Sequence, residues 1–390
     1  MVTLNKPSAG DTNWATPVND NWTAIEGAID QAISQGRLTL SSGNPIYNPL
    51  PKTPSSTDTV ADTVTFAAAH GWTTGTMVTP ATTIGGLTAG TTYYINAVSS
   101  TVVSFHTTLA NAEAGTPKVD LTASVTSEIR PFGVSRTTVY FTPYKGNRIG
   151  IYNGSTWKMF SFSEQSLSIS ALTANTNYDL FVYDSSGTVT LEALAWSTDT
   201  ARATDLVIQD GIYVKSGDTT RRYIGTIRIL ATTGQCEDSV LKRYMWNYYN
   251  RLPRKMVVYE TAGAWSYGSA AWRAANNNTA NRVQLVMGVN EDPVEGAAHG
   301  VDQGTSGNFQ LVGAGVGLDS TTVDSSDVGG GGSANNTTGL TDGDGYSSHF
   351  VLYTGIGFHF LQWLEYGGST LSFYGTSGPV RTGLKATIQA

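Results

Sequence analysis

The side chains that could hold a metal ion are few and scattered along the chain. There is one cysteine, Cys236, so neither a disulfide within one chain nor a multi-cysteine metal site can form. No two histidines stand at the H-x-x-x-H or H-x-H spacing that brings imidazoles to one ion. We therefore expect no metal site and no cofactor. The five histidines are His70, His106, His299, His349 and His359.

Paired carboxylates would be needed for glycosidase chemistry, which places two of them roughly 5–10 Å apart across a sugar. The candidates are Glu291, Asp292, Glu295 and Glu365. The first two belong to an N-E-D-P turn, where acidic residues are common in any case. Glu365 stands in a strand-like run beside aromatic residues. We expect no catalytic pair among them.

Two other motifs resemble catalytic or ion-binding sites only in part. Asp342 and Asp344 stand in T-D-G-D-G, which resembles the beginning of a calcium loop but lacks the distal glutamate of the full pattern. No G-x-S-x-G nucleophile elbow occurs in the sequence. The sequence thus predicts a protein that is not an enzyme.

The composition favours a rigid β structure. Of 390 residues only 14% are charged, against roughly 25% in ordinary soluble proteins, and 43 are glycine. The net charge is −7, and no basic run that could follow phosphates is present, so we expect no binding to nucleic acid. The first residues lack the pattern of a secretory signal. No apolar run approaches the roughly 20 residues of a membrane helix, so we expect no membrane insertion.

One helix is predicted, near the beginning of the chain. Thr16 is a suitable N-cap, and Pro17 at the first helical position loses no hydrogen bond by lacking an N–H. Gly36 is placed where a C-cap glycine ends a helix. A helix of about 20 residues is marginal alone in water, so this one needs a packing partner.

The helix carries a narrow apolar stripe. Trp22, Ile25 and Ile29 recur at spacings of three and four, and Trp14 comes just before them. Isoleucine at successive seam positions favours three-stranded association. We therefore predict that residues 1–36 form an attachment and trimerisation segment whose seam contains Trp14, Trp22, Ile25 and Ile29.

The remainder reads as short strands separated by turns, so the fold class is all-β. Four prolines make residues 37–56 linker-like. Regular turns at 57–130 predict a small β sandwich or barrel, and three hairpins mark a spacer module at 131–253. One of these hairpins turns at Asn153-Gly154, which is the strongest short hairpin signal. Residues 254–390 form the last β domain, which would be a terminal knob.

One strand of this last domain is apolar on both faces. It reads F-H-F-L-Q-W-L-E-Y and runs from Phe358 to Tyr366. A strand that is apolar on both faces is covered on both, either by a second sheet or by another subunit. We favour a subunit interface, with Phe358, Phe360 and Trp363 as its candidate residues.

Three stretches resemble proteins of tailed bacteriophages. Residues 4–30 resemble the N-terminal attachment segment of tail-fibre and other virion proteins; they read LNKPSAGDTNWATPVNDNWTAIEGAID. The region that begins at 140 with YFTPYKGNRIGIYNGSTWKMFSF is similar to a module of phage and prophage structural proteins. The region that begins at 66 with FAAAHGWTTGTMVT resembles a further small virion β module.

The resemblance implies a homotrimeric structural virion protein that is assembled in the host cytoplasm. Its N-terminus would bind tail, baseplate or capsid proteins, and its C-terminal domain would face a host glycan or protein receptor. We favour a short tail fibre, because the chain has no extended shaft. Two alternatives stay open, namely a capsid decoration or head-fibre protein and a polysaccharide-cleaving tailspike enzyme.

Overall fold

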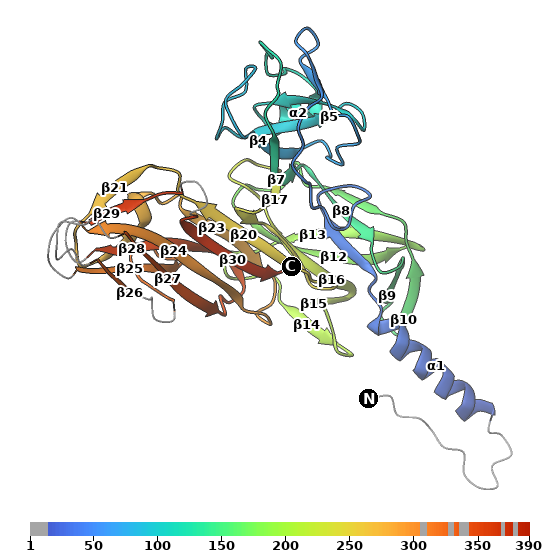
Figure 1. Ribbon diagram of the computed structural model, residues 1–390. Coiled ribbons are helices and arrows are strands. Elements are labelled where there is room, and N and C mark those ends of the chain that lie inside the picture. Colours follow the sequence, from blue (N-terminus) through green and yellow to red (C-terminus); the bar gives the residue numbers. More distant parts are fainter. Residues whose placement is uncertain (1–14, 305–309, 327–330, 335–342, 368–370, 377–380) are drawn as a thin grey trace. The chain divides into compact units, whose positions relative to one another are not determined.

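Strands make up most of the structure, as the all-β prediction requires. Figure 1 shows the computed structural model, which describes residues 15–304, 310–326, 331–334, 343–367, 371–376 and 381–390. The described residues form two compact units. One contains residues up to 47, residues 136–236 and residues 247–250, and the other contains residues 48–135, 237–246 and 251–390. Among the described residues, no helix is both long and apolar enough to span a membrane.

The first unit joins the N-terminal helix to a set of antiparallel strands. Its sheets have the orders β1-β8-β11, β10-β9 and β13-β12-β16-β15-β14. The elements are α1 (Ala15–Ala32), β1 (Gly36–Thr39), β8 (Thr138–Pro143), β9 (Arg148–Tyr152), β10 (Trp157–Ser161), β11 (Gln165–Ser168), β12 (Asn177–Ser185), β13 (Thr188–Ala195), β14 (Leu206–Gln209), β15 (Ile212–Lys215) and β16 (Asp218–Arg228).

The predicted hairpins of this unit are confirmed. β9 pairs with β10 so that Tyr152 faces Trp157, and Asn153 and Gly154 make the turn between them. The Asn153 side-chain oxygen accepts the N–H of Thr156 at 2.8 Å, and Gly154 takes a φ of +97° that few other residues adopt. β12 with β13, and β15 with β16, form the other two hairpins.

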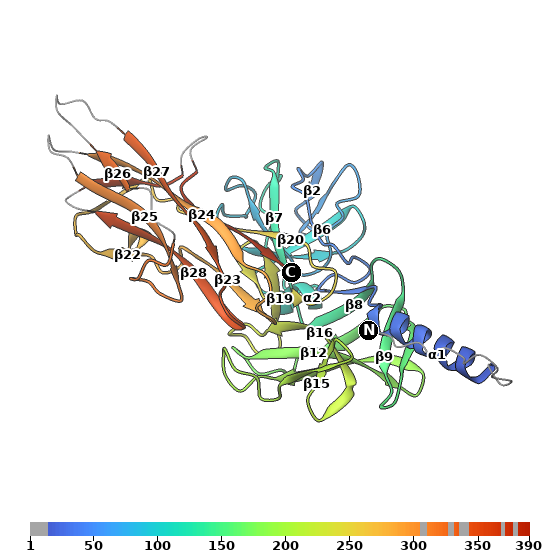
Figure 2. The same ribbon diagram turned by 90° about the horizontal axis from the view of Figure 1, so that it is seen from below.

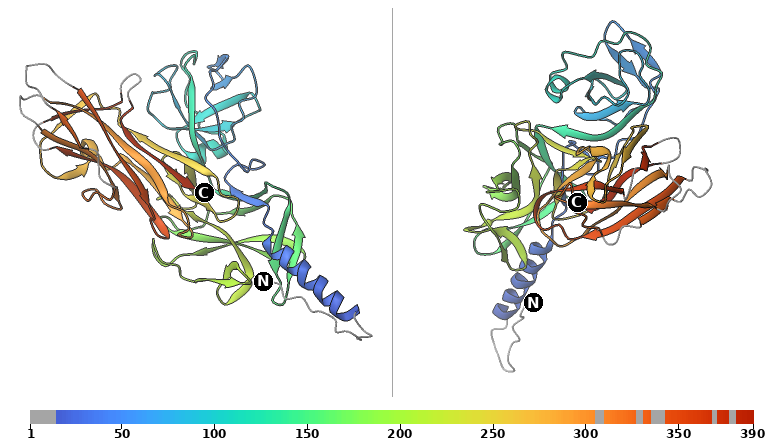
Figure 3. Two further views of the ribbon diagram at one scale, coloured as in Figure 1. Left: turned by 60° about the horizontal axis from the view of Figure 1, so that its bottom comes forward. Right: turned by 90° about the vertical axis from the view of Figure 1, so that its left-hand side faces the viewer.

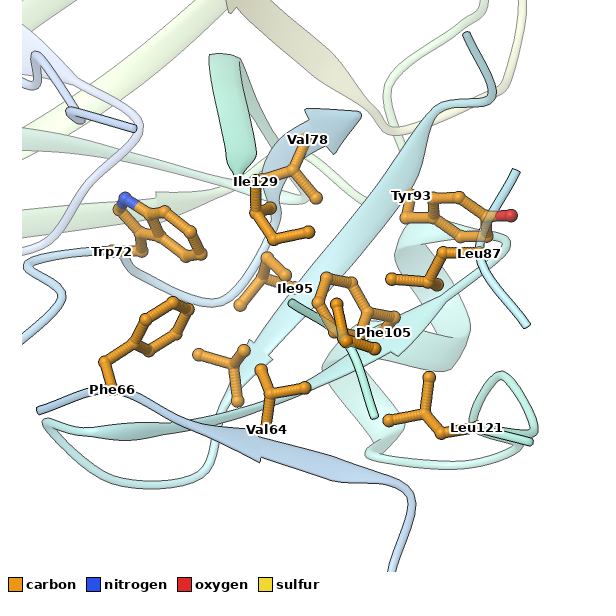
Figure 4. Packing of buried hydrophobic residues seen from close by; sticks show 12 residues of the cluster. Val64, Phe66, Trp72, Val78, Leu87, Tyr93, Ile95, Phe105, Leu121 and Ile129 are labelled. Atoms are coloured by element: carbon orange, nitrogen blue, oxygen red, sulfur yellow. The ribbon is translucent and has the colours of Figure 1, made fainter. Parts of the chain in front are cut away.

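The second unit begins with a small module that has its own core (Figure 4). Its elements are β2 (Ser56–Asp58), β3 (Thr63–Thr65), β4 (Thr76–Pro80), β5 (Tyr93–Ala97), β6 (Val102–His106), α2 (Leu109–Ala114) and β7 (Ile129–Arg136). Apolar side chains of these strands and their loops gather in one buried cluster. In it the rings of Phe66 and Trp72 meet edge to face with centroids 5.1 Å apart, so the aromatic residues of this module fill its interior.

Two sheets of the same unit pack face to face in the C-terminal sandwich. One contains β18-β23-β28-β25-β26 with β22, and the other contains β20-β30-β24-β29-β21 with β27. Trp265 of β21 stacks on Phe373 of β29 and meets the edge of Trp363 of β28, which joins the sheets. The strands and the 3-10 helix are β18 (Lys242–Arg243), β20 (Pro253–Tyr259), β21 (Ala264–Tyr267), β22 (Trp272–Ala274), η1 (Ala275–Asn277), β23 (Arg282–Met287), β24 (Val294–Gly304), β25 (Gln310–Leu318), β26 (Gly331–Ala334), β27 (Gly343–Leu352), β28 (Gly357–Gly367), β29 (Leu371–Tyr374) and β30 (Gly383–Gln389).

The order of strands also links the small module to the sandwich. β7 lies beside β17 (Cys236–Ser239), and β17 lies beside β18, so one continuous sheet runs from β2 to β26. Asp238 faces Arg243 where β17 and β18 pair. A last short strand, β19 (Met245–Asn247), crosses the boundary between the two units in the sequence.

Two sequence expectations need correction. The 37–56 stretch is not only a linker, because β1 begins at Gly36 and forms a buried strand against β8. Gly36 does not cap the helix, which ends at Ala32; the Phe141 ring occupies the place where a Cβ of residue 36 would lie. β29 follows β28 in the chain but pairs with β21 and β24 in the other sheet.

Candidate attachment helix and its anchor

α1 projects from the first unit, and only its C-terminal end lies beside β9 and β10 (Figure 1). The same arrangement is visible from below in Figure 2 and in the two views of Figure 3. At 1.5 Å per residue, its 18 residues extend over roughly 27 Å. The helix begins at Ala15, so Thr16 lies inside its first turn and is not the N-cap that we expected.

The predicted seam residues differ in their exposure. Trp22 is 61% exposed, which is unusual for so large an apolar side chain, and Ile25 is half-buried. Trp14 and the side chain of Ile29 lie outside the part of the chain that the structure describes. Trp22 and Ile25 lie three positions apart on one side of a projecting helix, so apolar side chains lie together on this side.

The end of α1 is fixed by hydrogen bonds with the β9–β10 hairpin. The N–H of Gly150 donates to the Ile33 carbonyl at 3.0 Å, and the N–H of Met159 donates to an Asp30 carboxylate oxygen at 3.1 Å. Gly150 is the residue that permits this approach, because a Cβ at that position would overlap the Asp30 carbonyl oxygen. The helix therefore leaves the unit from a rigid base.

A buried arginine completes this anchor. Arg222 of β16 is fully buried, and its Nη1 donates to the carbonyls of Ile33 at 3.0 Å and Gly150 at 2.7 Å. Its Nε donates to the Tyr249 hydroxyl at 3.2 Å, and the guanidinium lies 5.6 Å from the Trp157 ring. A cation placed at a helix C-terminus is favoured by the helix dipole. Arg222 thus ties the end of α1 to two strands.

The chain immediately after the helix is held as firmly. The N–H of Gln35 donates to the Arg148 carbonyl at 2.9 Å, and the Gln35 side chain accepts the N–H of Arg148 at 3.0 Å. The Asn250 amide donates to the carbonyls of Ser34 and Gly36, each at 3.0 Å. These contacts leave little freedom between α1 and β1.

The predicted interface residues of the C-terminal domain differ in their burial. Phe358 and Phe360 are half-buried; Phe358 meets the Tyr244 ring, and Arg282 lies 4.8 Å above the Phe360 ring. Trp363, in contrast, is 2% exposed inside the sandwich. The expectation that Trp363 reaches a subunit interface was wrong, because the second sheet of the same chain covers it.

The carboxylates considered for catalysis are mostly engaged in ion pairs. Glu291 and Asp292 both pair with Arg251, at 2.7 and 2.8 Å. Glu365 is 1% exposed and accepts from Trp265 Nε1 at 2.6 Å and Arg273 Nε at 2.7 Å. Burial raises the pKa of Glu365 above its ordinary value despite both donors. These three carboxylates therefore have structural partners.

No group of three or more histidine, cysteine, aspartate or glutamate side chains gathers into a possible metal site among the described residues.

The residues that sequence reasoning missed are Asp30, Gly150 and Arg222. Two signals pointed to them weakly, namely a glycine inside the apolar strand R-I-G-I-Y and an arginine inside the strand that continues as Y-I-G-T-I. Neither signal indicates which residue the glycine or the arginine contacts.

Comparison with known proteins gives only remote likenesses. No protein-family model matches the chain, and no curated protein is significantly similar to it. The insecticidal delta-endotoxin Cry8Ea1 from Bacillus thuringiensis is 8% identical with a TM-score of 0.20, over 67% of this chain and 50% of that chain. The mosquito-larvicidal Cry4Aa toxin from Bacillus thuringiensis is also 8% identical, with a TM-score of 0.17, over 65% and 49%.

A viral protein is similarly distant. The structure of the infectious bursal disease virus Gx strain is 10% identical with a TM-score of 0.18, over 91% of this chain and 80% of that chain. This chain spans about half the length of the two toxins. At these TM-scores we take no function from the likenesses.

Proposed function

We propose that this chain is a structural protein of a tailed-bacteriophage particle, a short homotrimeric tail fibre that attaches through its N-terminal segment. The observation that carries the proposal is the exposed Trp22 on a helix that projects from a rigid base. The resemblance of residues 4–30 to virion attachment segments supports it from the sequence. In this role the protein binds and spaces other components, and it needs no catalysis.

The physical reason is the unsatisfied apolar surface of α1. An 18-residue helix with Trp22 61% exposed gains little from its own chain beyond the last turn. Burying the remainder of one tryptophan side chain stabilises a complex by roughly 2–3 kcal/mol, and a trimer makes this contribution three times. Three sister helices and a socket on the particle would together cover this surface.

The anchor supports attachment through the N-terminal part of α1. Because Arg222 and Gly150 fix the C-terminal end of α1, the free N-terminal part can enter a socket without disturbing the strands. In the proposal the C-terminal sandwich contacts a host surface. Three copies would raise weak individual contacts to useful avidity.

The test is incorporation of variants into particles. Trp22→Asp places a charge on the proposed seam, and we expect particles purified from cells that encode this variant to lose the protein. Ile208→Asp is the matched control, because Ile208 is 65% exposed on the edge strand β14. Normal incorporation of the Trp22→Asp chain, judged by protein content of purified particles, would overturn the proposal.

A truncation provides a second test, and the structure decides where it should end. Removing residues 1–36 would also remove Asp30, Ile33 and Gln35, which bind the β9–β10 hairpin and its flanks. A deletion of residues 1–29 keeps these anchor contacts. We expect this shorter deletion to leave a folded protein that no longer joins particles.

A further inference from the structure

An open hollow of about 610 Å³ lies on one face of the C-terminal sandwich. This volume falls within the range of ligand sites, which is roughly 300–1,000 Å³. Four neighbouring strands form its floor, in the order β20-β30-β24-β27, and they lie side by side in Figure 1. Its lining includes Lys255, Lys385, Glu295, His349, Thr387 and Val351.

Strand register explains why these strands leave a hollow. One row across the sheet reads Lys255, Thr387, Glu295 and Val351, because each of these residues faces the next in the pairing of the strands. Alternate residues of a strand point to the same face, so all four lie on the outward side. The short Thr387 side chain in the row gives depth between longer neighbours.

The adjacent row repeats the pattern. Lys385 faces Ala297, and Ala297 faces His349. Ala297 is the small residue here, and it lies between a lysine and a histidine. The floor is therefore short and partly apolar, whereas the surrounding side chains are long and charged.

The charge of the hollow is opposite to that of the chain as a whole. Two lysines and a histidine line it with one glutamate, in a chain whose net charge is −7. Among the described residues, neither Lys255 nor Lys385 forms an ion pair with a carboxylate. His299 lies on the same strand as Glu295. Its pKa is lowered by burial first, and then by the nearby Lys385 and His349.

We propose that this hollow binds a saccharide that carries carboxylate groups. Lys255 and Lys385 supply charge for the carboxylates, and Thr387 and Glu295 can hydrogen-bond to sugar hydroxyls. Val351, which is 54% exposed, and Ala297 offer apolar contact for the C–H face of a ring. A polyphosphate chain fits less well, because Glu295, which faces Thr387 one strand beyond the lysines, would repel an anion that is charged along its whole length. A saccharide presents hydroxyl groups to this glutamate and carboxylates to the lysines.

The experiment measures binding of trigalacturonate, an acidic trisaccharide, to the full chain by calorimetry at low salt and neutral pH. We expect binding that is at least tenfold tighter than that of neutral galactotriose and that weakens as salt is added. Lys385→Gln should weaken it by about tenfold or more, since charged hydrogen bonds contribute at this level. Lys158→Gln is the matched control, because Lys158 is an exposed lysine on β10.

A second readout reports on the same site. Bound carboxylates would offset the positive charge of Lys385 and the effect of His349, so the pKa of His299 should rise when trigalacturonate is added, as followed by histidine NMR.

Absence of trigalacturonate binding, equal binding of galactotriose, or equal behaviour of the two lysine variants would each overturn the inference. So would self-association of the chain that Lys385→Gln abolishes without any saccharide effect, because the face would then bind a second copy. Particle incorporation plays no part in this test, so it can fail independently of the proposed function.

Discussion

Gly150 of β9 lies so close to Asp30 of α1 that a Cβ built on Gly150 would overlap the Asp30 carbonyl oxygen. This contact, together with the hydrogen bond from Gly150 N–H to Ile33, makes the base of the helix part of the folded unit. The proposed attachment through α1 depends on that base, because a helix on a loose tether could not set the direction of a fibre.

The first prediction concerns this contact. Gly150→Ala forces β9 and the end of α1 apart, and we expect a loss of stability of about 1–3 kcal/mol, as is usual for overpacking. Urea unfolding measures the loss, and faster proteolysis within residues 15–32 should accompany it. Gly263→Ala is the control, since nothing lies within 4 Å of a Cβ there. Equal stability of the two variants would contradict the close approach.

The second prediction concerns the buried arginine. Arg222→Met keeps much of the apolar bulk but removes the donors to the Ile33 and Gly150 carbonyls, so we expect a loss of about 3 kcal/mol. Arg130→Met is the comparison, because Arg130 is 57% exposed in its surface pair with Glu128. Exposed pairs contribute roughly 0–1 kcal/mol, so this variant should unfold almost as the wild type does. A similar small effect for both would mean that Arg222 does not hold the helix.

Local signals in the sequence predicted the strands and hairpins well, because turn residues act over a few positions. Asn153-Gly154 predicted the β9–β10 hairpin correctly. The Asn153 side chain and the positive φ of Gly154 form the turn through local contacts alone. The helix was also found, although its limits differed. These features depend on neighbours in the chain.

Long-range pairing was beyond the sequence. β29 follows β28 closely, yet it pairs with strands of the opposite sheet, and alternation of residues does not name a partner strand. For the same reason Trp363 was misplaced at a subunit interface, because apolarity on both faces cannot distinguish a second sheet from a second chain. Arg222 and Gly150 went unnoticed since their role arises only when residue 33 meets them in space.

The third prediction concerns acid. Burial lowers the pKa values of His70 and His106 below 6.5, so both are neutral in the folded small module at pH 7. His70 accepts the Trp72 N–H at Nδ1 and contacts the Ser99 carbonyl with Nε2, which suits only the neutral ring. Their stabilisation is present above pH 6.5 and is lost as pH falls through the folded pKa values, because the unfolded chain binds protons more readily.

Histidine NMR titration checks this behaviour. We expect both resonances to titrate below 6.5. The unfolding free energy should fall as the pH drops below 6.5, by about 1.4 kcal/mol for each pH unit that separates the folded from the unfolded pKa of a histidine. Midpoints above 6.5 would show that these rings are not held neutral.

The fourth prediction concerns the ion pair inside the sandwich. Arg273→Met leaves the buried Glu365 carboxylate with Trp265 as its remaining side-chain donor, and we expect a loss of about 3–5 kcal/mol. Glu365→Gln removes the charge but keeps hydrogen-bonding capacity, so its cost should be distinctly smaller. Urea unfolding of the two variants gives the comparison. A larger cost for Glu365→Gln would mean that the charge itself stabilises the fold.

The most direct test of the proposed attachment is cryo-electron microscopy of an intact particle that contains this chain. We predict three copies at each attachment point, with the N-terminal ends of their α1 helices in a socket and their C-terminal sandwiches turned away from the particle. A different number of copies at each point, or the sandwich bound to the particle and α1 free, would contradict this prediction.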